Sequence, residues 1–388
     1  MMQKFVETVV VCSEVAANIA RACRSEEALF HLLVEEKVGE SRQKLTRSDF
    51  KTVADVLVQV AVRERLVREY PSLVSHVHGE EDDSVLIDDR RVSIRLTESE
   101  DDTARMLSRI LNDETAAAAL AAAVHQAVRT VPDSSLSDIG SLDIDTENIA
   151  VWIDPIDNTG AYIAGRNGTL NEYGIFNDSL QCVTVIIGVF DRSTGEPIVG
   201  VINQPFFDCR GATCWAGKCI WGVAYEDCFC NSLKTGLAQG PTTTGLSSLA
   251  SAQDNMLLVL SQSELPSVVK LLSDRGFTIQ YAGGAGYKLL CVIEGTACAY
   301  LVSTSSTFKW DTCGPHAILR SMGGNLLCLK NVVKKLPSHY HLIQYNRPDM
   351  GGLTAGQMWR NEGGVFAFAN RQTLETVVDV LDPVVGDL

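Results

Sequence analysis

The sequence predicts a mixed α/β protein of the α+β layered class, in which helices and sheets are stacked in layers. Helical periodicity dominates the first 70 residues, whereas short strand-like segments and helices share the chain from residue 149 onward. The chain has 388 residues, 46% of them hydrophobic, so it can bury a large core and divide into two lobes. We expect the division near Pro205, between residues 1–205 and 206–388.

The N-terminal elements follow from apolar spacing and from a helix-stopping residue. Apolar residues at helical spacing predict helices at 6–20 and 28–33. A polar, basic stretch at 37–48 separates them from a long helix over 53–69, which Pro71 stops. Further along, the pattern predicts short strands at 73–78 and 93–96. It also predicts one helix with an acidic start at 98–102, a second helix over 115–123, and a polar loop at 133–148.

The second half of the chain is typical of strands joined by turns and helices. The apolar segment 149–153 predicts a buried strand, and segments 182–190 and 198–203 predict a hairpin. Residues 214–225 are expected to form another hairpin around Gly217. The remaining expected elements are a surface loop at 235–251, strands at 256–261, 278–281, 297–302 and 364–369, and helices at 266–275, 287–294, 315–322 and 374–380.

The charge balance excludes several classes of partner. The chain has 33 Lys and Arg against 48 Asp and Glu, a formal net charge of −15, which argues against binding nucleic acid or an anionic membrane surface. An acidic site that holds metal ions can still bind phosphate. The sequence shows no signal peptide and no apolar segment near the ~20 residues of a membrane helix. We therefore expect a cytoplasmic protein.

The cysteines give a second indication of the compartment. The chain has twelve of them without a CxxC pair, which predicts reduced thiols. No histidine lies among the densest group, so we interpret that group as half-buried cysteines of the core and turns, with a zinc site as the alternative. The group comprises Cys209, Cys214, Cys219, Cys228 and Cys230.

The most specific chemical motif follows the strand at 149–153. Asp154 and Asp157 lie three residues apart where the strand ends, with the carbonyl of Ile156 between them. Carboxylates and a carbonyl are the ligands that Mg²⁺ prefers. Pro155 makes the turn rigid. An Asx turn with a helix-capping Asp is the alternative interpretation.

Four further acids lie at the ends of predicted elements. Glu80 and Glu81 follow a short strand, Asp311 opens a helix, and Asp55 lies at the start of the helix over 53–69. Taken singly, these residues are typical of a solvated turn, a helix cap and a surface acid. Taken together with Asp154 and Asp157, they predict a carboxylate cluster of the kind that two-metal phosphoryl transfer requires.

These segments resemble the three signatures of the lithium-sensitive, Mg²⁺-dependent phosphomonoesterase superfamily, which includes inositol monophosphatase, fructose 1,6-bisphosphatase and the bisphosphate nucleotidases. The signatures correspond to Gly79-Glu80-Glu81, Asp154–Thr159 and Trp310-Asp311. Over almost the whole chain, longer strings resemble the branch that removes the 1-phosphate from inositol polyphosphates. These strings are DFKTVADVLVQ, VWIDPIDNT, GVINQPF, GAGYKLLCV and TFKWDTCGPHAILRSMGG.

The resemblance implies an inositol monophosphatase-like αβαβα sandwich of two sheets and flanking helices. It also implies two or three Mg²⁺ ions as cofactor, Li⁺ as an inhibitor, and a monomer acting on a small-molecule inositol polyphosphate. The implied reaction is hydrolysis of the 1-phosphate of inositol 1,4-bisphosphate and inositol 1,3,4-trisphosphate by a metal-activated water.

The resemblance assigns the metal ligands. Glu80 and Asp154 would share the first Mg²⁺ with the carbonyl of Ile156. The second ion would be held by Asp154, Asp157 and Asp311. The N-terminal lobe would then carry most of the ligands, and the C-terminal lobe would supply Asp311 and the substrate-binding loop.

The implied catalytic set consists of Asp55, Thr159 and Glu81. Asp55 and Thr159 would orient and deprotonate the attacking water, with the threonine hydroxyl passing its proton toward Asp55. Glu81 would support a more weakly held ion or its waters.

The resemblance places the substrate as well. The 1-phosphate would lie beside Asp157 at the amides of Asn158 and Thr159. Lys288 follows a glycine loop, where a cation suits a remote phosphate, although a surface lysine is the alternative. The residues expected to meet the inositol ring and its other phosphates are Ser263, Gly284, Ala285, Lys288 and Ser306.

Two departures from the family pattern concern the substrate. Asn158 stands where relatives more often have Ser or Gly, and Glu264 follows Ser263 where a lysine is expected. A 3′(2′),5′-bisphosphate nucleotidase, which would use the same metals, is the alternative function. A catalytically inactive phosphate-binding relative is a further alternative, although all six acids are present.

Overall fold

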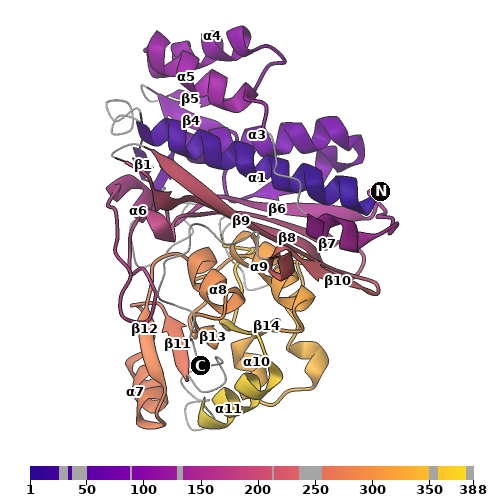
Figure 1. Ribbon diagram of the computed structural model, residues 1–388, viewed down its shortest axis with the longest axis vertical. Helices are drawn as coiled ribbons and strands as arrows, with labels where there is room; N and C mark the ends of the chain where they lie inside the picture. The colour runs from indigo at the N-terminus through magenta and orange to yellow at the C-terminus, as the bar shows by residue number, and fades with distance from the viewer. Residues whose placement is uncertain are drawn as a thin grey trace.

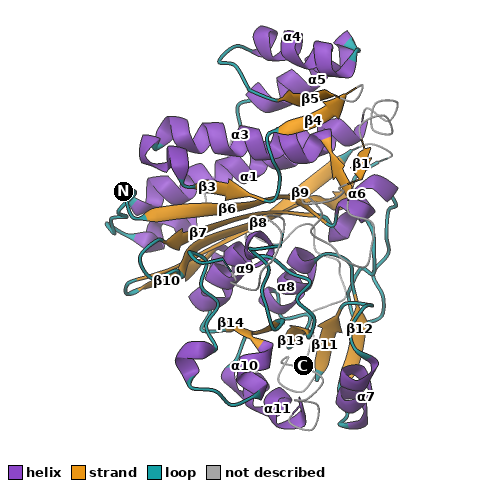
Figure 2. Cartoon of the chain, turned by 180° about the vertical axis from the view of Figure 1, so that it is seen from behind, coloured by secondary structure: helices purple, strands orange, loops and turns teal. Residues whose placement is uncertain are grey.

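The computed structural model is built on two large sheets with layers of helices outside and between them, and it has two further sheets of two strands each (Figure 1). Helices α1 (Met2–Ser25) and α3 (Val53–Glu69) cover one face of a six-stranded sheet. Between the two large sheets lie α8 (Ala285–Ile293) and α9 (Lys309–Ser321), as Figure 2 also shows. The predicted αβαβα sandwich is therefore confirmed. The residues described are 1–25, 34–36, 50–87, 90–128, 134–211, 214–235, 256–348 and 357–381.

The six-stranded sheet has the order β10-β9-β8-β7-β6-β3. All neighbouring pairs are antiparallel except β3 and β6, which run parallel. Its central strands are buried on both faces, because helices cover both sides. The strands are β3 (Val77–Gly79), β6 (Ile149–Asp157), β7 (Thr184–Asp191), β8 (Pro197–Cys209), β9 (Trp215–Tyr225) and β10 (Cys228–Asn231).

The five-stranded sheet has the order β12-β11-β13-β15-β14. Strands β12 (Thr278–Tyr281), β11 (Leu257–Leu260) and β13 (Ala299–Val302) are parallel, so their carboxyl ends share one edge. Its outer face carries α7 (Pro266–Asp274), α10 (Leu329–Val333) and α11 (Arg371–Leu381). The other elements are the paired strands β1 (Val34–Glu36) and β2 (Phe50–Thr52), the paired strands β4 (Ser84–Ile87) and β5 (Arg90–Ser93), β14 (Asn325–Cys328), β15 (Val365–Phe368), α4 (Glu100–Leu111), α5 (Glu114–His125) and α6 (Thr159–Ala164).

A row of glycines lets α9 approach the six-stranded sheet. Gly188 of β7 pairs with Gly200 of β8, which pairs with Gly222 of β9. A Cβ atom on Gly188 would lie 2.3 Å from the backbone N of Gly314 in α9, and one on Gly200 would lie 1.9 Å from its carbonyl oxygen. On Gly222 the added atom would lie 2.9 Å from Cα of Ile318. The absence of side chains at these three positions therefore sets the position of the helix.

The predicted hairpin over 214–225 is wrong. Residues 215–225 form the single strand β9, and the turn falls at Glu226 and Asp227, where Glu226 has a φ of 51°. Gly217 is used for packing rather than for turning, since a Cβ there would lie 2.9 Å from Nη1 of Arg21 in α1. A glycine within an apolar segment marks close approach as readily as it marks a turn.

Other boundaries also differ from the expectation. The first residues of the expected strand at 73–78 belong instead to a 3₁₀ helix, Pro71–Ser75, and β3 starts only at Val77. Helix α9 begins at Lys309, before the predicted 315, which places Asp311 inside its first turn. The loop expected at 133–148 contains the 3₁₀ helix Ser134–Ile139, the strand expected at 93–96 already ends at Ser93, and β14 and α10 were not anticipated.

Some expectations fall outside the described residues. These are the helical pattern at 28–33, the basic stretch at 37–48 and the loop at 235–251 beyond its first residue. The expected division after Pro205 lies inside β8, and its position stays a prediction. Among the described helices, none has the length and hydropathy needed to cross a membrane.

Candidate active site

A β-bulge brings two carboxylates to the same side of β6. Asp154 faces Ile186 of β7 and Asp157 faces Thr184, so three steps along β6 match two steps along β7. In a regular strand, residues three apart point to opposite faces. The extra residue turns Asp157 to the side of Asp154. The spacing of the motif thus gives convergence only because the strand is irregular at Pro155 and Ile156.

Helix α9 supplies a third carboxylate from the other half of the chain. The Oδ2 atom of Asp311 accepts the backbone N–H of Phe308 at 2.5 Å, which fixes the side chain at the first turn of the helix. One carboxylate oxygen from each of Asp154, Asp157 and Asp311 lies within 4.8 Å of the others. All three side chains are buried, between 1% and 9% exposed. Three of the six acids of the predicted cluster therefore converge, and the joint action of all six stays a prediction.

The electrostatics of this cluster favour a bound cation. Burial raises the pKa of Asp154 well above its usual range, and the charges of Glu80, Asp157 and Asp311 raise it further. Burial and the charges of Asp157 and Glu80 also raise the pKa of Asp311. Oδ1 of Asp154 has no hydrogen-bond partner within the described part of the chain. Such a set of buried oxygens, one of them unsatisfied, fits Mg²⁺ or another hard cation.

The segment after β3 carries the two predicted glutamates to different surroundings. The backbone N–H of Glu80 donates to the carbonyl of Ile153 at 3.1 Å, so this segment continues alongside β6, and its charge acts on Asp154 and Asp311. Glu81 instead approaches Lys51, with Oε2 3.6 Å from Nζ and both side chains about 5% exposed or less. Lys51 was assigned no role in the site from the sequence, because nothing in its position four residues before Asp55 indicates that it approaches Glu81.

Asp55 and Thr159 are both held by local hydrogen bonds. Oδ2 of Asp55 accepts the backbone N–H of Thr52 at 2.8 Å and its hydroxyl at 2.5 Å, so Asp55 forms part of the capping box of α3. The hydroxyl of Thr159 donates to the carbonyl of Ile156 at 3.1 Å. Burial raises the pKa of the Tyr162 hydroxyl in α6, and Asp55 contributes, so the starts of α3 and α6 are neighbours.

The glycine loop before α8 is anchored on Asp157. The backbone N–H groups of Ala285 and Gly286 donate to its carboxylate at 3.2 and 2.8 Å, and the hydroxyl of Thr184 donates at 3.2 Å. Gly284 has a φ of +72°, and a Cβ on it would lie 2.7 Å from Oδ2 of Asp157. The glycines therefore allow the start of α8 to contact the acidic cluster.

Lys288 is buried beneath this loop rather than exposed on its surface. Its ammonium donates to the carbonyls of Gly284 at 2.6 Å and Ala282 at 3.3 Å, and it lies 5.4 Å from the ring centroid of Tyr300. Burial lowers its pKa, while Asp157 and Asp311 oppose that shift. A direct contact with a substrate phosphate stays a prediction, because the ammonium is engaged by the loop.

The other predicted substrate residues surround the same edge. Asn158 adopts a left-handed conformation with φ 67° at the start of α6 and donates to Asp178 Oδ1 at 3.2 Å. Ser263 and Ser306 are exposed and follow β11 and β13, whose carboxyl ends lie side by side. Glu264 is buried, and its Oε2 accepts the backbone N–H of Ser303 at 2.9 Å, which ties the two loops together.

His316, one turn beyond Asp311, has a structural environment. Its ring nitrogens lie 3.0 Å from the hydroxyl of Tyr345 and 2.7 Å from Oδ1 of Asn325. Burial lowers the pKa of His316 to about 3. The ring is therefore neutral at physiological pH and is engaged on both sides.

Known proteins show similarity over almost the whole chain. The sequence model of the inositol monophosphatase family matches residues 83–361. The inositol polyphosphate 1-phosphatase of Homo sapiens is 39% identical over 396 residues, covering 98% of this chain and 97% of the relative. A 3′(2′),5′-bisphosphate nucleotidase 1 of Mus musculus is 28% identical, covering 79% and 77%. The crystal structure of the extragenic suppressor protein suhB of Bartonella henselae shares the fold, with a TM-score of 0.52, 12% identity and coverage of 97% and 98%.

Proposed function

The chain belongs to the inositol monophosphatase family, and from this premise we propose that it is a Mg²⁺-dependent phosphomonoesterase acting on inositol polyphosphates. The proposed reaction removes the 1-phosphate of inositol 1,4-bisphosphate and inositol 1,3,4-trisphosphate. The single observation that supports catalysis most strongly is the convergence of Asp154, Asp157 and Asp311 within 4.8 Å. The choice of substrate is supported by the 39% identity to a human inositol polyphosphate 1-phosphatase.

Five of the six acids have a proposed ligand role. Glu80, Asp154 and the carbonyl of Ile156 would hold one Mg²⁺, and Asp154, Asp157 and Asp311 a second. Glu81 would serve a third, weaker position, where Lys51 now offsets its charge. Bound Mg²⁺ lowers the pKa of a coordinated water and stabilises negative charge on the leaving oxygen. The unsatisfied Oδ1 of Asp154 supports this assignment, because an anionic oxygen with no partner is costly to bury.

The residues around the cluster would position the water and its proton. Thr159 would orient the attacking water through its hydroxyl, whose bond to Ile156 keeps it at the cluster. Asp55 would hold the proton, and its bonds from Thr52 keep its carboxylate oriented. Replacing Asp55 with Asn should leave Mg²⁺ binding intact and lower kcat at least 100-fold. Survival of turnover in that variant would remove Asp55 from the mechanism.

The substrate would be held by both halves of the chain. The backbone N–H groups of Asn158 and Thr159 would receive the 1-phosphate. The ring and its other phosphates would lie along the edge that carries Ser263, the loop Gly284–Ala285 and Ser306, with Lys288 contributing positive charge beneath the loop. The proposed lobes, residues 1–205 and 206–388, would then meet at the substrate.

We test the substrate by measuring phosphate release from inositol 1,4-bisphosphate, with and without Mg²⁺ and Li⁺. 3′-Phosphoadenosine 5′-phosphate serves as the competing substrate, because a nucleotidase also resembles this chain. Mg²⁺-dependent, Li⁺-inhibited release from the inositol compound is the expected result. A preference for the nucleotide would keep the metal chemistry and overturn the substrate. Release from neither compound would favour the inactive phosphate-binding relative.

The proposal includes a monomer that works in the cytoplasm. All twelve cysteines are thiols, which suits a reducing compartment. Sedimentation of the purified chain and fractionation of cells that express it would check the two statements separately.

A further inference from the structure

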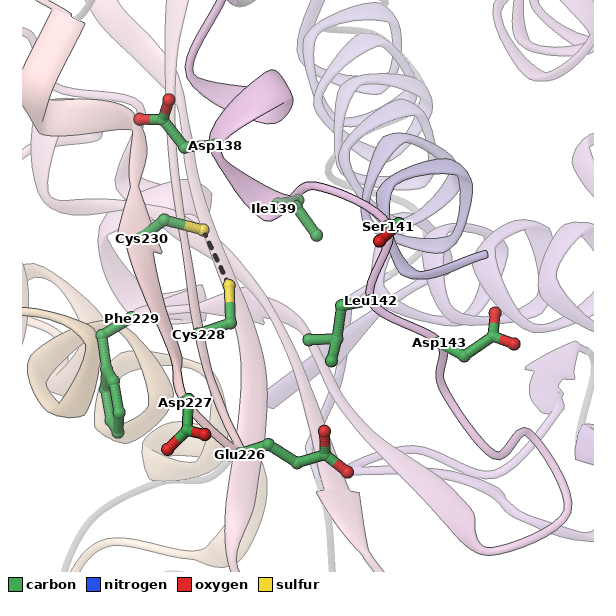
Figure 3. A pocket seen from close by; sticks show the side chains of 10 residues that line it. All are labelled: Asp138, Ile139, Ser141, Leu142, Asp143, Glu226, Asp227, Cys228, Phe229 and Cys230. Atoms are coloured by element: carbon green, nitrogen blue, oxygen red, sulfur yellow. Dashed lines mark hydrogen bonds between the residues drawn. The ribbon is translucent and has the colours of Figure 1, made fainter.

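Recognition of the proposed substrate requires a site that handles several negative charges. Each phosphate monoester carries a charge of about −1.5 to −2 at neutral pH. A separate cavity of about 840 Å³ beside β10 does not suit such a molecule (Figure 3), because its ten described lining residues include four carboxylates and no basic side chain. The residues that select among phosphates therefore lie at the edge of the acidic cluster, where the glycine loop meets the turn at Asn158.

Asp178 brings a carboxylate to this edge from the segment between α6 and β7. Its Oδ1 accepts a hydrogen bond from the side-chain amide of Asn158 at 3.2 Å. A Cβ atom on Gly283 would lie 2.5 Å from the same oxygen and 2.6 Å from Nδ2 of Asn158. The backbones are joined as well, since the N–H of Gly283 donates to the carbonyl of Asn177 at 2.6 Å. The carboxylate therefore lies between the turn proposed to bind the 1-phosphate and the loop proposed to meet the inositol ring.

The pairing with Asp178 gives a role to Asn158, which stands where relatives more often have Ser or Gly. Its amide fixes the position of the carboxylate. Asp178 is exposed, and within the described part of the chain the amide of Asn158 is its only hydrogen-bond donor. An ionised carboxylate has about four acceptor sites. Asp178 therefore keeps the capacity to accept hydrogen bonds from a ligand.

The negative charge of Asp178 is separate from the metal cluster. Among the described residues, the three carboxylates that converge within 4.8 Å do not include it. Its charge acts beside the glycine loop, where burial raises the pKa of the Cys182 thiol to about 11, Asp178 adds to this rise and Lys288 opposes it. Mg²⁺ bound at the cluster would offset the three buried carboxylates and leave the charge of Asp178 facing the substrate.

We propose that Asp178 determines specificity by selecting a substrate with a hydroxyl group, rather than a second phosphate, on a carbon next to the hydrolysed ester. This inference rests on the function proposed above and deepens it. A carboxylate accepts a hydrogen bond from a hydroxyl group but repels a phosphate in the same place, so the wrong isomer loses a contact and meets a repulsion. In inositol 1,4-bisphosphate and inositol 1,3,4-trisphosphate, both carbons next to C1 carry hydroxyl groups. Inositol 1,2-bisphosphate and inositol 1,6-bisphosphate carry a phosphate at one of these carbons.

The experiment compares inositol 1,4-, 1,2- and 1,6-bisphosphate, which have the same formula and charge. Calorimetry with Mg²⁺ measures their dissociation constants on the full-length Asp55→Asn protein, in which turnover is expected to be slow. We expect the 1,4 isomer to bind at least 10-fold more tightly than the isomer whose second phosphate faces Asp178. Adding Asp178→Asn, which removes the charge and keeps an acceptor for Asn158, should reduce this preference at least 5-fold. Glu172→Gln is the matched control, because it removes an exposed charge from the same segment, and it should leave the preference unchanged.

A second measurement leaves Asp178 in place. Added KCl should reduce the preference for the 1,4 isomer, because salt screens an exposed charge. A preference that neither Asp178→Asn nor KCl changes, or an equal effect of Glu172→Gln, would overturn this inference and leave the proposed function standing. Failure of all three isomers to bind, together with no phosphate release from inositol 1,4-bisphosphate by the unmodified protein, would overturn the proposed function and this inference with it.

Discussion

The side-chain amide of Gln59 holds the backbone of Glu81 from both sides. Its Oε1 accepts the N–H of Glu81 at 2.9 Å, and its Nε2 donates to the carbonyl of the same residue. Gly79 makes room for this contact, since a Cβ there would lie 2.0 Å from Oε1. Gln59 lies one helical turn after Asp55, so one face of α3 carries Asp55 and fixes the segment with Glu80 and Glu81.

Replacing Gln59 with Met should weaken metal binding more than substrate binding. The methionine fills a similar volume but leaves the N–H and carbonyl of Glu81 without their partners, so the segment loses its fixed position. We expect the Mg²⁺ concentration for half-maximal activity to rise about 10-fold, with the substrate KM changing less than 3-fold. Mg²⁺ titration by calorimetry should show the same loss of affinity. Arg68→Met, an exposed position on the same helix, is the control, and an equal effect there would contradict the assignment.

Asp154→Asn should stabilise the metal-free protein and abolish its response to Mg²⁺. Burial and three neighbouring charges penalise ionised Asp154, as its raised pKa indicates, and the amide removes this penalty. We expect the Tm without Mg²⁺ to rise by about 1–3 °C, corresponding to about 1–2 kcal/mol. Calorimetric scans with and without Mg²⁺ measure both effects. A metal-free Tm that falls would mean that the cluster is not electrostatically strained.

Gly286→Ala should inactivate the protein by displacing the start of α8. The added Cβ would lie 2.2 Å from Oγ1 of Thr184 and 3.0 Å from Oδ2 of Asp157, so the two N–H donors cannot keep their bonds. A loss of kcat/KM of at least 100-fold is expected. Gly160→Ala is the matched control, because nothing lies within 4 Å of its added Cβ. Similar kinetics for the two variants would contradict the anchoring role of Asp157.

His316 should make the protein less stable as the pH falls from about 6.5 toward 3. Its folded-state pKa is lowered to about 3 by burial, so in this interval the unfolded chain binds a proton that the folded chain does not. The loss amounts to about 1.4 kcal/mol per pH unit, or about 2 kcal/mol between pH 7 and pH 5. Urea unfolding of the wild type and His316→Gln at both pH values tests this. In the variant, the free energy of unfolding should fall by about 2 kcal/mol less between pH 7 and pH 5 than in the wild type. An equal fall in both proteins would exclude His316 as the source of this pH dependence.

The fold could be predicted wherever local signals were complete. Helix α3 was predicted at its observed bounds because Pro71 stops it and the apolar pattern starts at Val53. The hairpin over 214–225 failed because Gly217 supports the approach of Arg21, a contact between residues about 200 positions apart in the sequence. No local pattern distinguishes these two uses of glycine.

In the candidate site, too, the residues with a local sequence motif were predicted, whereas their contacts with distant parts of the chain were not. The acids of the cluster were recognised by type and motif, and Asp154, Asp157 and Asp311 do converge. The surroundings of Lys51 and Lys288 were not predicted, because a lysine bonded to carbonyls or to a buried carboxylate looks in sequence like a lysine in solvent. Gln59 likewise has no sequence signature beyond its place one turn after Asp55.

The three glycines beneath α9 link the protein's packing to its affinity for metal. Gly188, Gly200 and Gly222 set how deeply the helix sits, and that depth fixes where Asp311 stands relative to Asp154. A methyl group added at any of these three glycines would displace α9. The displacement would move Asp311 relative to Asp154, although none of the three glycines is itself a metal ligand. Genetic variants at these positions should therefore both melt earlier and need more magnesium.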